Sequence, residues 1–350
     1  MQRVRGAVGA HFASHRGRCL LFPETGHAVL DRAPARTIKR LAALGVKIRA
    51  EATLRRPNST ISSAPRGQAI LDTLELAWAV RALGIGAASQ DGLGIRVGLI
   101  DSGVDLLHPA LIGNVSAGSP RGGLDSLGHG THCAGIIAGR KLGTSPRFGI
   151  APRAHVRSYR VFDADATTDE GHVREHVHRA VEDGCKVIVL AAGVPASNFL
   201  AEDATLGQWL ASVGCLMFAA AGNESDRLAH RVLPTLAPAN APQVYAIGAV
   251  NGAVRLWNSS NGLGVDAATR VDFVAPGVDV LSAWPGNRTM RVSGSSAATA
   301  VAGGVAAALW SRTPALSARE VITLMSRLCR MDVLGDRDGI GTGMLSLLNK

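Results

Sequence analysis

Short, nearly continuous apolar runs alternate with longer stretches of helical spacing between residues 95 and 250. The apolar runs predict strands over 95–100, 156–161, 187–191, 215–220 and 244–249. Helices are predicted between them, over 131–138, 171–183 and 200–213. Strands that are apolar at almost every position are typical of a parallel sheet that is buried on both faces. We therefore expect an α/β fold, in which helices flank a parallel sheet on both faces.

The most apolar helix of the chain is predicted from Gly294 to Trp310, and it opens with two adjacent hydroxyls, Ser295 and Ser296. Because it is apolar on every side, this helix must be buried. The N–H groups and the positive dipole end of its first turn would stabilise an oxyanion formed beside a serine nucleophile. The alternative is a serine that only caps a packing helix.

The N-terminal part of the chain predicts a small α+β segment. It is expected to contain a strand, a helix and a second strand, over 27–30, 35–44 and 46–50. Residues 58–67 are rich in Ser, Pro and Gly and indicate a linker, and a further helix is expected over 69–83. We therefore divide the chain into an N-terminal accessory segment, 1–70, and a main domain, 71–350.

The positive charge of the chain belongs to its N-terminal segment. The formal net charge is +10, and residues 1–70 carry 11 Arg and 2 Lys against 3 acidic residues, so the remainder is neutral. A basic segment can bind nucleic acid, but this one has only two aromatic residues among its basic ones, Phe12 and Phe22, and no zinc-ligand spacing. We expect no nucleic-acid partner, and we expect residues 1–70 to dock on the main domain of the same chain.

Cysteine usage and the N-terminal sequence favour a cytoplasmic protein. The five cysteines are scattered, at positions 19, 133, 185, 215 and 329, which favours reduced thiols over disulfides or a zinc cluster. The first 19 residues contain four arginines but no apolar run after them, so no secretory signal is expected. No apolar run reaches the length of a membrane span. Export by another route stays open.

Polar residues stand where predicted strands end or predicted helices begin. Asp101 and Asn223 follow strands, whereas His129, His132 and Ser296 lie at helix starts. Ligands of parallel α/β sheets bind at the carboxyl ends of the strands. Each residue also has an ordinary interpretation: a loop or cap for Asp101, a packed histidine for His129 or His132, and turn chemistry for Asn223. Their joint occurrence at one edge favours a catalytic site.

Four motifs of the chain resemble those of the subtilisin-like serine peptidases, or subtilases. In chain order they are Val97-Gly98-Leu99-Ile100-Asp101-Ser102-Gly103-Val104, Gly128-His129-Gly130-Thr131-His132-Cys133-Ala134-Gly135, Ala220-Ala221-Gly222-Asn223-Glu224 and Gly294-Ser295-Ser296-Ala297-Ala298-Thr299. The order Asp, His, Ser along the chain is that of subtilisin. The resemblance extends over about residues 75–327 and implies a subtilisin-like fold.

The resemblance also implies a role for each matching residue. Ser296 corresponds to the nucleophile, His129 to the general base and acid, and Asp101 to the carboxylate that orients the histidine. Asn223 corresponds to the side-chain donor of the oxyanion hole, with the Ser296 N–H as its partner. His132 is expected to pack beside the site without reacting.

Substrate-binding residues are carried over in the same way. Ala191, Ala192 and Gly193 replace the usual wall of the primary specificity pocket, and Ala221, Gly222 and Glu224 flank Asn223. The backbone of such a wall can pair with an extended substrate. Our hypothesis for Glu224 is that it lies at the pocket mouth and favours Arg or Lys before the scissile bond.

A calcium ion is common in subtilases, but its usual ligands are not evident here. The matching positions carry His108-Pro109-Ala110 and Arg140-Lys141-Leu142-Gly143-Thr144, which supply cations in place of oxygen ligands. We therefore expect no metal and no other cofactor.

The sequence thus predicts a serine endopeptidase that forms an acyl-enzyme on a polypeptide substrate. One form of this hypothesis is a dedicated intracellular protease that processes a precursor or leader peptide. A catalytically silent scaffold that binds peptides in the same groove is the main alternative, and an acyl hydrolase of the esterase type is another. Residues 1–70 would then act as a propeptide or as a fixed accessory segment.

Overall fold

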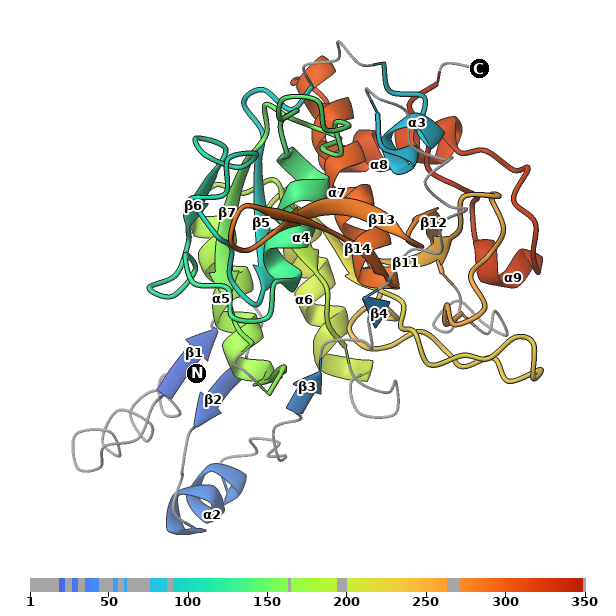
Figure 1. Ribbon diagram of the computed structural model, residues 1–350. Helices are drawn as coiled ribbons and strands as arrows, with labels where there is room; N and C mark the ends of the chain where they lie inside the picture. Colours follow the sequence, from blue (N-terminus) through green and yellow to red (C-terminus); the bar gives the residue numbers. More distant parts are fainter. Residues whose placement is uncertain are drawn as a thin grey trace.

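The protein is represented by a computed structural model that describes residues 19–22, 27–30, 35–43, 53–55, 60–61, 76–86, 91–162, 165–193, 200–262 and 271–348. A seven-stranded sheet lies at the centre of the described part (Figure 1). Neighbouring strands in it are parallel. Across the sheet, the order is β12 (Phe273–Pro276), β11 (Val244–Val250), β10 (Leu216–Ala220), β9 (Val187–Leu190), β5 (Arg96–Asp101), β7 (His155–Arg160) and β6 (Val115–Ala117).

Helices cover both faces of this sheet, because its strands are apolar on both sides. Val97 and Leu99 of β5 belong to a core shared with α4 (His129–Ala138) and α7 (Ser295–Arg312). Ile100 belongs to the opposite core, with α5 (Glu170–Glu182) and α6 (Leu200–Ser212). The α/β fold expected from the sequence is therefore confirmed.

The helix α7 lies against the middle of the sheet, and its residues from Ser295 to Trp310 are buried. Glycine permits this close approach, because a Cβ atom on Gly303 would lie 2.4 Å from Val189 Cγ2. Shorter helices lie toward the end of the molecule that holds the C-terminus (Figure 1). They are α3 (Trp78–Ala82), α8 (Ala318–Leu328) and α9 (Arg337–Ile340).

An antiparallel hairpin leads directly into α7, and the sequence pattern did not predict it. It consists of β13 (Val280–Trp284) and β14 (Arg288–Ser293). The N-terminal strand β4 (Thr60–Ile61) adds to β14, with Thr60 opposite Ser293. Another N-terminal strand, β3 (Thr53–Arg55), pairs with β8 (Thr167–Asp169) just before α5. Two strands of the main domain are thus each extended by the N-terminal segment.

The rest of the described N-terminal segment is an antiparallel pair and a helix, at the lower end of the molecule in Figure 1. They are β1 (Cys19–Phe22), β2 (His27–Leu30) and α2 (Ala35–Ala43). The expected strand over 27–30 and helix over 35–44 are confirmed. Residues 46–50 and 69–75 lie outside the described residues. The helix expected over 69–83 is confirmed only for α3, because Leu76 forms a β-bridge with Arg147 instead.

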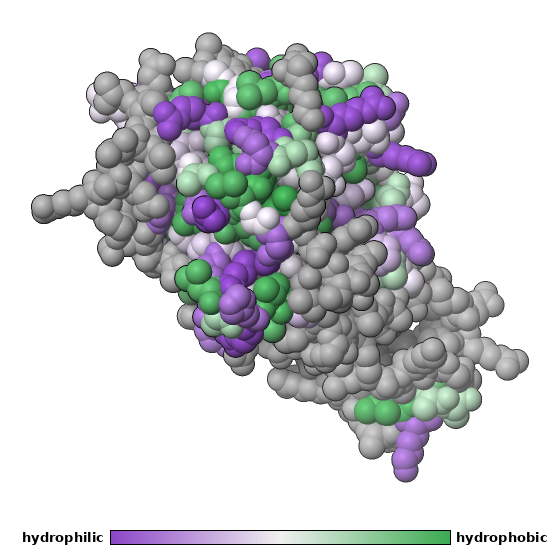
Figure 2. All heavy atoms as spheres, turned by 90° about the vertical axis from the view of Figure 1, so that its right-hand side faces the viewer, coloured by the Kyte–Doolittle hydropathy of each residue, from purple (hydrophilic) through white to green (hydrophobic). Residues whose placement is uncertain are grey.

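The linker prediction for residues 58–67 was wrong at Thr60 and Ile61, because sheet pairing with β14 recruits them. No helix in the part of the chain that the structure describes combines the length and apolar character needed to cross a bilayer. On the face shown in Figure 2, hydrophobic side chains lie between hydrophilic ones over the upper half of the molecule.

Candidate active site

Asp101, His129 and Ser296 form one hydrogen-bonded chain. His129 Nδ1 lies 2.8 Å and 2.9 Å from the two carboxylate oxygens of Asp101. His129 Nε2 lies 2.9 Å from Ser296 Oγ. Because a carboxylate only accepts, Nδ1 carries the proton and Nε2 presents its lone pair to the serine hydroxyl. All three residues are at most 1% exposed.

Each of these residues stands at the end of an element. Asp101 is the last residue of β5, His129 the first of α4, and Ser296 the second of α7. The carboxyl end of a parallel sheet and the starts of two helices on one face therefore converge on one point. Gly128 turns the chain into α4 with a φ of 81°, a left-handed conformation that suits glycine.

Asp125 holds the start of α4 in place, although it belongs to none of the motifs recognised in the sequence. Its Oδ1 accepts hydrogen bonds from the Ser102 hydroxyl and from the N–H groups of Leu127 and Gly128. Its Oδ2 accepts from the N–H and the hydroxyl of Thr131. Burial raises the pKa of Asp125, while the bonds from Thr131 and Ser102 oppose that rise. An acidic residue just before a predicted helix start was the available signal.

Ser102 connects Asp125 to both sides of the site. Its hydroxyl donates to Asp125 and accepts the N–H of Gly130, at 2.9 Å in each case. Ser102 follows Asp101 directly in the chain. The end of β5 and the first turn of α4 are thereby fixed to each other through side chains.

Asn223 is tied to the start of α7. Its Oδ1 accepts the Ser295 N–H at 2.8 Å. This bond fixes the orientation of the side-chain amide and leaves its NH₂ group as a hydrogen-bond donor. The Ser295 hydroxyl in turn accepts the N–H of Gly222 at 3.1 Å. The structure therefore brings Asn223 to the same helix terminus as Ser296.

The residues expected to bind substrate follow two adjacent strands. Ala191, Ala192 and Gly193 follow β9, and Ala221 and Gly222 follow β10, which pairs with β9. All five are buried. Their backbones therefore lie at the same edge of the sheet as Asp101.

Glu224 is partly buried and bonded both to its chain neighbour and to a distant loop. Its Oε2 accepts the N–H of Asn223 and the amide of Asn261, each at 2.8 Å. The carboxylate therefore lies directly beside Asn223.

His132 and Cys133 lie behind the hydrogen-bonded chain. His132 Nε2 donates to the carbonyl of Val280 at 2.9 Å, and burial lowers the pKa of His132 to about 4. His132 is therefore neutral at pH 7 and packs under the site. Cys133 Sγ lies 3.9 Å from His129 Nδ1.

The residues at the expected calcium position do not fit a calcium ion. His108 donates from Nε2 to the carbonyl of Arg288 at 2.8 Å. The Arg140 guanidinium donates to Asn114 Oδ1, so this side-chain oxygen is already bonded to a positive charge and is not free to bind calcium. A second cation at this place would be repelled.

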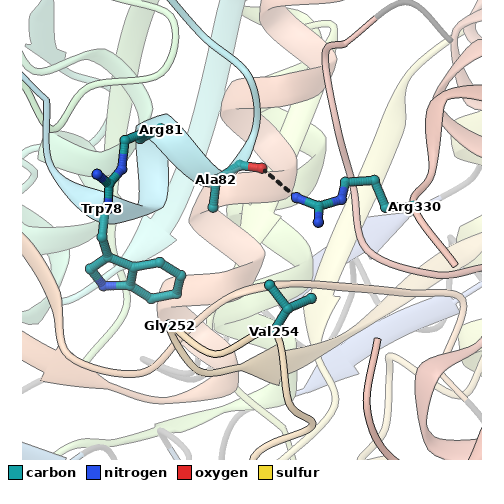
Figure 3. Close-up of a pocket in the computed structure, with 6 residues that line it drawn as sticks. All are labelled: Trp78, Arg81, Ala82, Gly252, Val254 and Arg330. Carbon is teal, nitrogen blue, oxygen red and sulfur yellow. Dashed lines mark hydrogen bonds between the residues drawn. The ribbon is translucent and has the colours of Figure 1, made fainter. Parts of the chain in front are cut away.

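A cavity of about 260 Å³ lies elsewhere, beside α3 (Figure 3). Trp78, Arg81, Val254 and Arg330 are among its lining residues, and none of its six lining residues belongs to the site described above. The positive charge of Arg330 is offset by its ion pair with Asp332.

Comparison with known proteins identifies the family of the chain. The family model described as the subtilase family matches residues 92–337. A thermophilic serine proteinase from Bacillus sp. (strain AK1) is 34% identical over 63% of this chain and 53% of that protein. Subtilisin DY from Bacillus licheniformis is 27% identical over 77% of this chain and 94% of that protein.

Among solved structures, sphericase superposes with a TM-score of 0.67 at 23% identity, over 77% of this chain and 98% of the other. The fold and the arrangement of the site define a subtilisin-like α/β protein. The chain belongs to the subtilase family. It spans about half the length of the thermophilic serine proteinase that it matches.

Proposed function

We propose that the protein is a serine endopeptidase that hydrolyses peptide bonds through Asp101, His129 and Ser296. The hydrogen-bonded chain of these three side chains is the observation that carries the proposal. A serine hydroxyl is a weak nucleophile until a neighbouring imidazole takes its proton. His129 lies at hydrogen-bond distance for that transfer, with its tautomer fixed by Asp101.

The reaction proceeds in two halves. Ser296 Oγ attacks the carbonyl carbon of the scissile bond while His129 Nε2 takes the hydroxyl proton. His129 then gives this proton to the leaving amine nitrogen, the C–N bond breaks, and an acyl ester remains on Ser296. Water attacks the ester by the same proton transfers in reverse, which releases the acid and restores Ser296.

Asn223 and the first turn of α7 stabilise the oxyanion of each tetrahedral intermediate. The bond from the Ser295 N–H to Asn223 Oδ1 supports this role, because it leaves the NH₂ group as the donor end of the amide. The Ser296 N–H supplies a second donor, and the dipole of α7 adds to both. In subtilisin, loss of the asparagine donor lowers kcat about 10²–10³-fold.

The substrate is a polypeptide that binds as an extended strand along Ala191, Ala192 and Gly193, with Ala221 and Gly222 at the pocket. Glu224 favours Arg or Lys before the scissile bond, because its carboxylate lies beside Asn223. Profiling with a peptide library tests this preference. Glu224→Gln should reduce cleavage after basic residues and leave cleavage after apolar residues unaffected. An unchanged profile would contradict the preference for Arg or Lys.

The N-terminal segment, 1–70, docks over the active site of its own chain. Two backbone pairings support this: β3 adds to β8, and β4 adds to β14, which ends at Ser293, three residues before Ser296. Between Arg55 and Thr60 the chain can span at most about 18 Å. The ends of β3 and β4 therefore lie within that distance of each other, and Ser296 is 0% exposed, which supports a segment that covers it.

A dedicated processing role inside the cell suits the remaining features. Cys133, Cys185, Cys215 and Cys329 are buried free thiols among the described residues. Burial raises the pKa of Cys185 to about 11, so this thiol is unreactive at pH 7. The proposed chemistry uses no metal or other cofactor.

Hydrolysis of a quenched peptide pool tests the function. The wild type should cleave the pool, Ser296→Ala should not, and Asn223→Ala should retain a small fraction of kcat. Peptide binding by the wild type without any cleavage, after removal of residues 1–70, would favour the silent scaffold. Cleavage of simple esters but of no peptide would favour an acyl hydrolase of the esterase type.

A further inference from the structure

A cluster of histidine and glutamate side chains lies on α5, outside the site described above. His172, Glu175 and His176 each offer one ligand atom, and these atoms lie within 4.8 Å of one another. Residues three and four positions apart lie on the same side of a helix. The spacing His-x-x-Glu-His is one that metal-binding helices use, although here it belongs to no catalytic group already described.

The His176 ring is held in the orientation and tautomer of a metal ligand. Its Nδ1 lies 2.9 Å from the carbonyl oxygen of His172, and a carbonyl only accepts, so Nδ1 carries the proton. The lone pair is therefore on Nε2. Histidine ligands commonly donate their other N–H to a backbone carbonyl in this way. His176 is 5% exposed, and its ring meets that of Tyr159 edge-on.

His172 is oriented by the neighbouring strand. Its Nδ1 lies 3.4 Å from the Thr168 hydroxyl in β8, and its own N–H donates to Asp169, the cap of α5. The rings of His172 and His176 are nearly perpendicular, with centroids 4.6 Å apart. Both imidazoles thus converge at the first turns of α5.

We propose that His172, Glu175 and His176 bind one divalent transition-metal ion, with Zn²⁺ as the expected ion. Two imidazoles and a carboxylate are a zinc ligand set, which a water molecule completes to four. Imidazole ligands select against Ca²⁺ and Mg²⁺, which prefer oxygen alone. All three ligands belong to α5, so the bound ion cross-links its first two turns.

A second group of side chains could also bind a metal ion and would compete for it. It consists of Asp101, His129 and Cys133. The carboxylate of Asp101 and the imidazole of His129 are already hydrogen-bonded to each other, and the imidazole to Ser296. An assay of metal binding must therefore separate the two groups. His178 provides a matched control on α5, because its ring stacks on Trp209 of α6, with centroids 4.0 Å apart.

Calorimetric titration of Zn²⁺ into the full chain tests the site, with Ser296→Ala as the background to prevent self-cleavage. We expect one ion per chain and a Zn²⁺-dependent rise in Tm, because a ligand that binds only the folded state stabilises it. Co²⁺ should give the visible absorption of a four-coordinate site. His178→Gln should retain the affinity and the Tm shift.

Mutation of a residue that only hydrogen-bonds to a metal ligand lowers metal affinity roughly 10–100-fold, and loss of a ligand itself should lower it more. His172→Gln and His176→Asn should therefore each weaken Zn²⁺ binding at least 100-fold, and His172→Gln, at the half-buried position, should keep the metal-free Tm. Unchanged affinity in both variants would overturn the proposal. Loss of binding in Cys133→Ser with retention in His172→Gln, or no binding by the parent chain, would overturn it as well.

Discussion

At the scale of single residues, the site depends on side chains that hold the reacting groups in place. Asp125 accepts hydrogen bonds from both ends of the junction between β5 and α4, through Ser102 on one side and Thr131 on the other. Because His129 is the first residue of α4, these bonds set its distance from Asp101. Asp125 is therefore a positioning residue.

Replacement of Asp125 by Asn should lower kcat about 10- to 100-fold with little change in KM. The NH₂ group of the asparagine would face donors that now bond to a carboxylate oxygen, so the first turn of α4 shifts. A small displacement of His129 lowers the rate by this much. Steady-state kinetics on a peptide substrate measures both constants. Asp332→Asn, at an exposed carboxylate that pairs with Arg330, should leave them unchanged. A raised KM at normal kcat would contradict the positioning role.

His132 should make stability depend on pH below neutrality. Burial lowers the pKa of His132 from 6.5 to about 4 in the folded state, so the unfolded chain binds the proton first. Stability that is present above pH 6.5 is therefore lost as the pH falls toward 4, by about 3 kcal/mol.

Urea unfolding of the Ser296→Ala protein between pH 4 and 7 measures this loss. His132→Gln should flatten the pH dependence over that range, whereas His230→Asn, at an exposed position, should not. An equal slope in the parent and in His132→Gln would show that His132 contributes nothing to it.

The sequence indicated the residues of the proposed triad because each follows or begins a strongly patterned element. It did not indicate the roles of Asp125 and Ser102, although Ser102 lies in the first motif, since these roles come from hydrogen bonds across loops that no periodicity reveals. Glu224 shows the same limit: its place beside Asn223 was expected, but its bond to the distant Asn261 was not.

At the scale of elements, α7 determines where Ser296 lies. This helix packs on β9, β10 and β11, and it needs glycine where it crosses Val189. The long central elements were predicted to within two residues, because near-continuous apolar strands and an apolar helix are strong patterns. The hairpin β13–β14 and the two-residue strand β4 were missed, because short strands are defined by their partners.

Gly303→Ala should destabilise the fold by about 1–3 kcal/mol, because the added methyl would overpack the contact with Val189. Urea unfolding in the Ser296→Ala background measures the change. Gly86→Ala provides the control, since a Cβ atom there meets nothing within 4 Å. Equal stabilities of the two variants would show that α7 can move away from the sheet at no cost.

At the scale of the whole molecule, a basic N-terminal segment meets a neutral domain. The segment contributes strands to two separate places, β8 beside α5 and β14 before α7. Its charge could be counted from the sequence, but the pairing could not, because it joins residues more than 100 positions apart.

Self-cleavage should occur between Arg55 and Thr60, because the strand that follows this interval pairs with β14, which ends three residues before Ser296. Intact-mass spectrometry and N-terminal sequencing of the purified wild type locate the cut, and Ser296→Ala should remain full length. A wild-type chain that stays intact during hydrolysis of an added peptide would identify residues 1–70 as a fixed accessory segment.

Labelling with a fluorophosphonate tests the proposed role of Ser296 most directly, since the reagent phosphonylates only an activated serine. With residues 1–70 removed, the label should map to Ser296 by peptide mass spectrometry. The rate should fall by at least about 10³-fold in His129→Ala. No label on Ser296, or a label that forms equally fast without His129, would contradict the proposed mechanism.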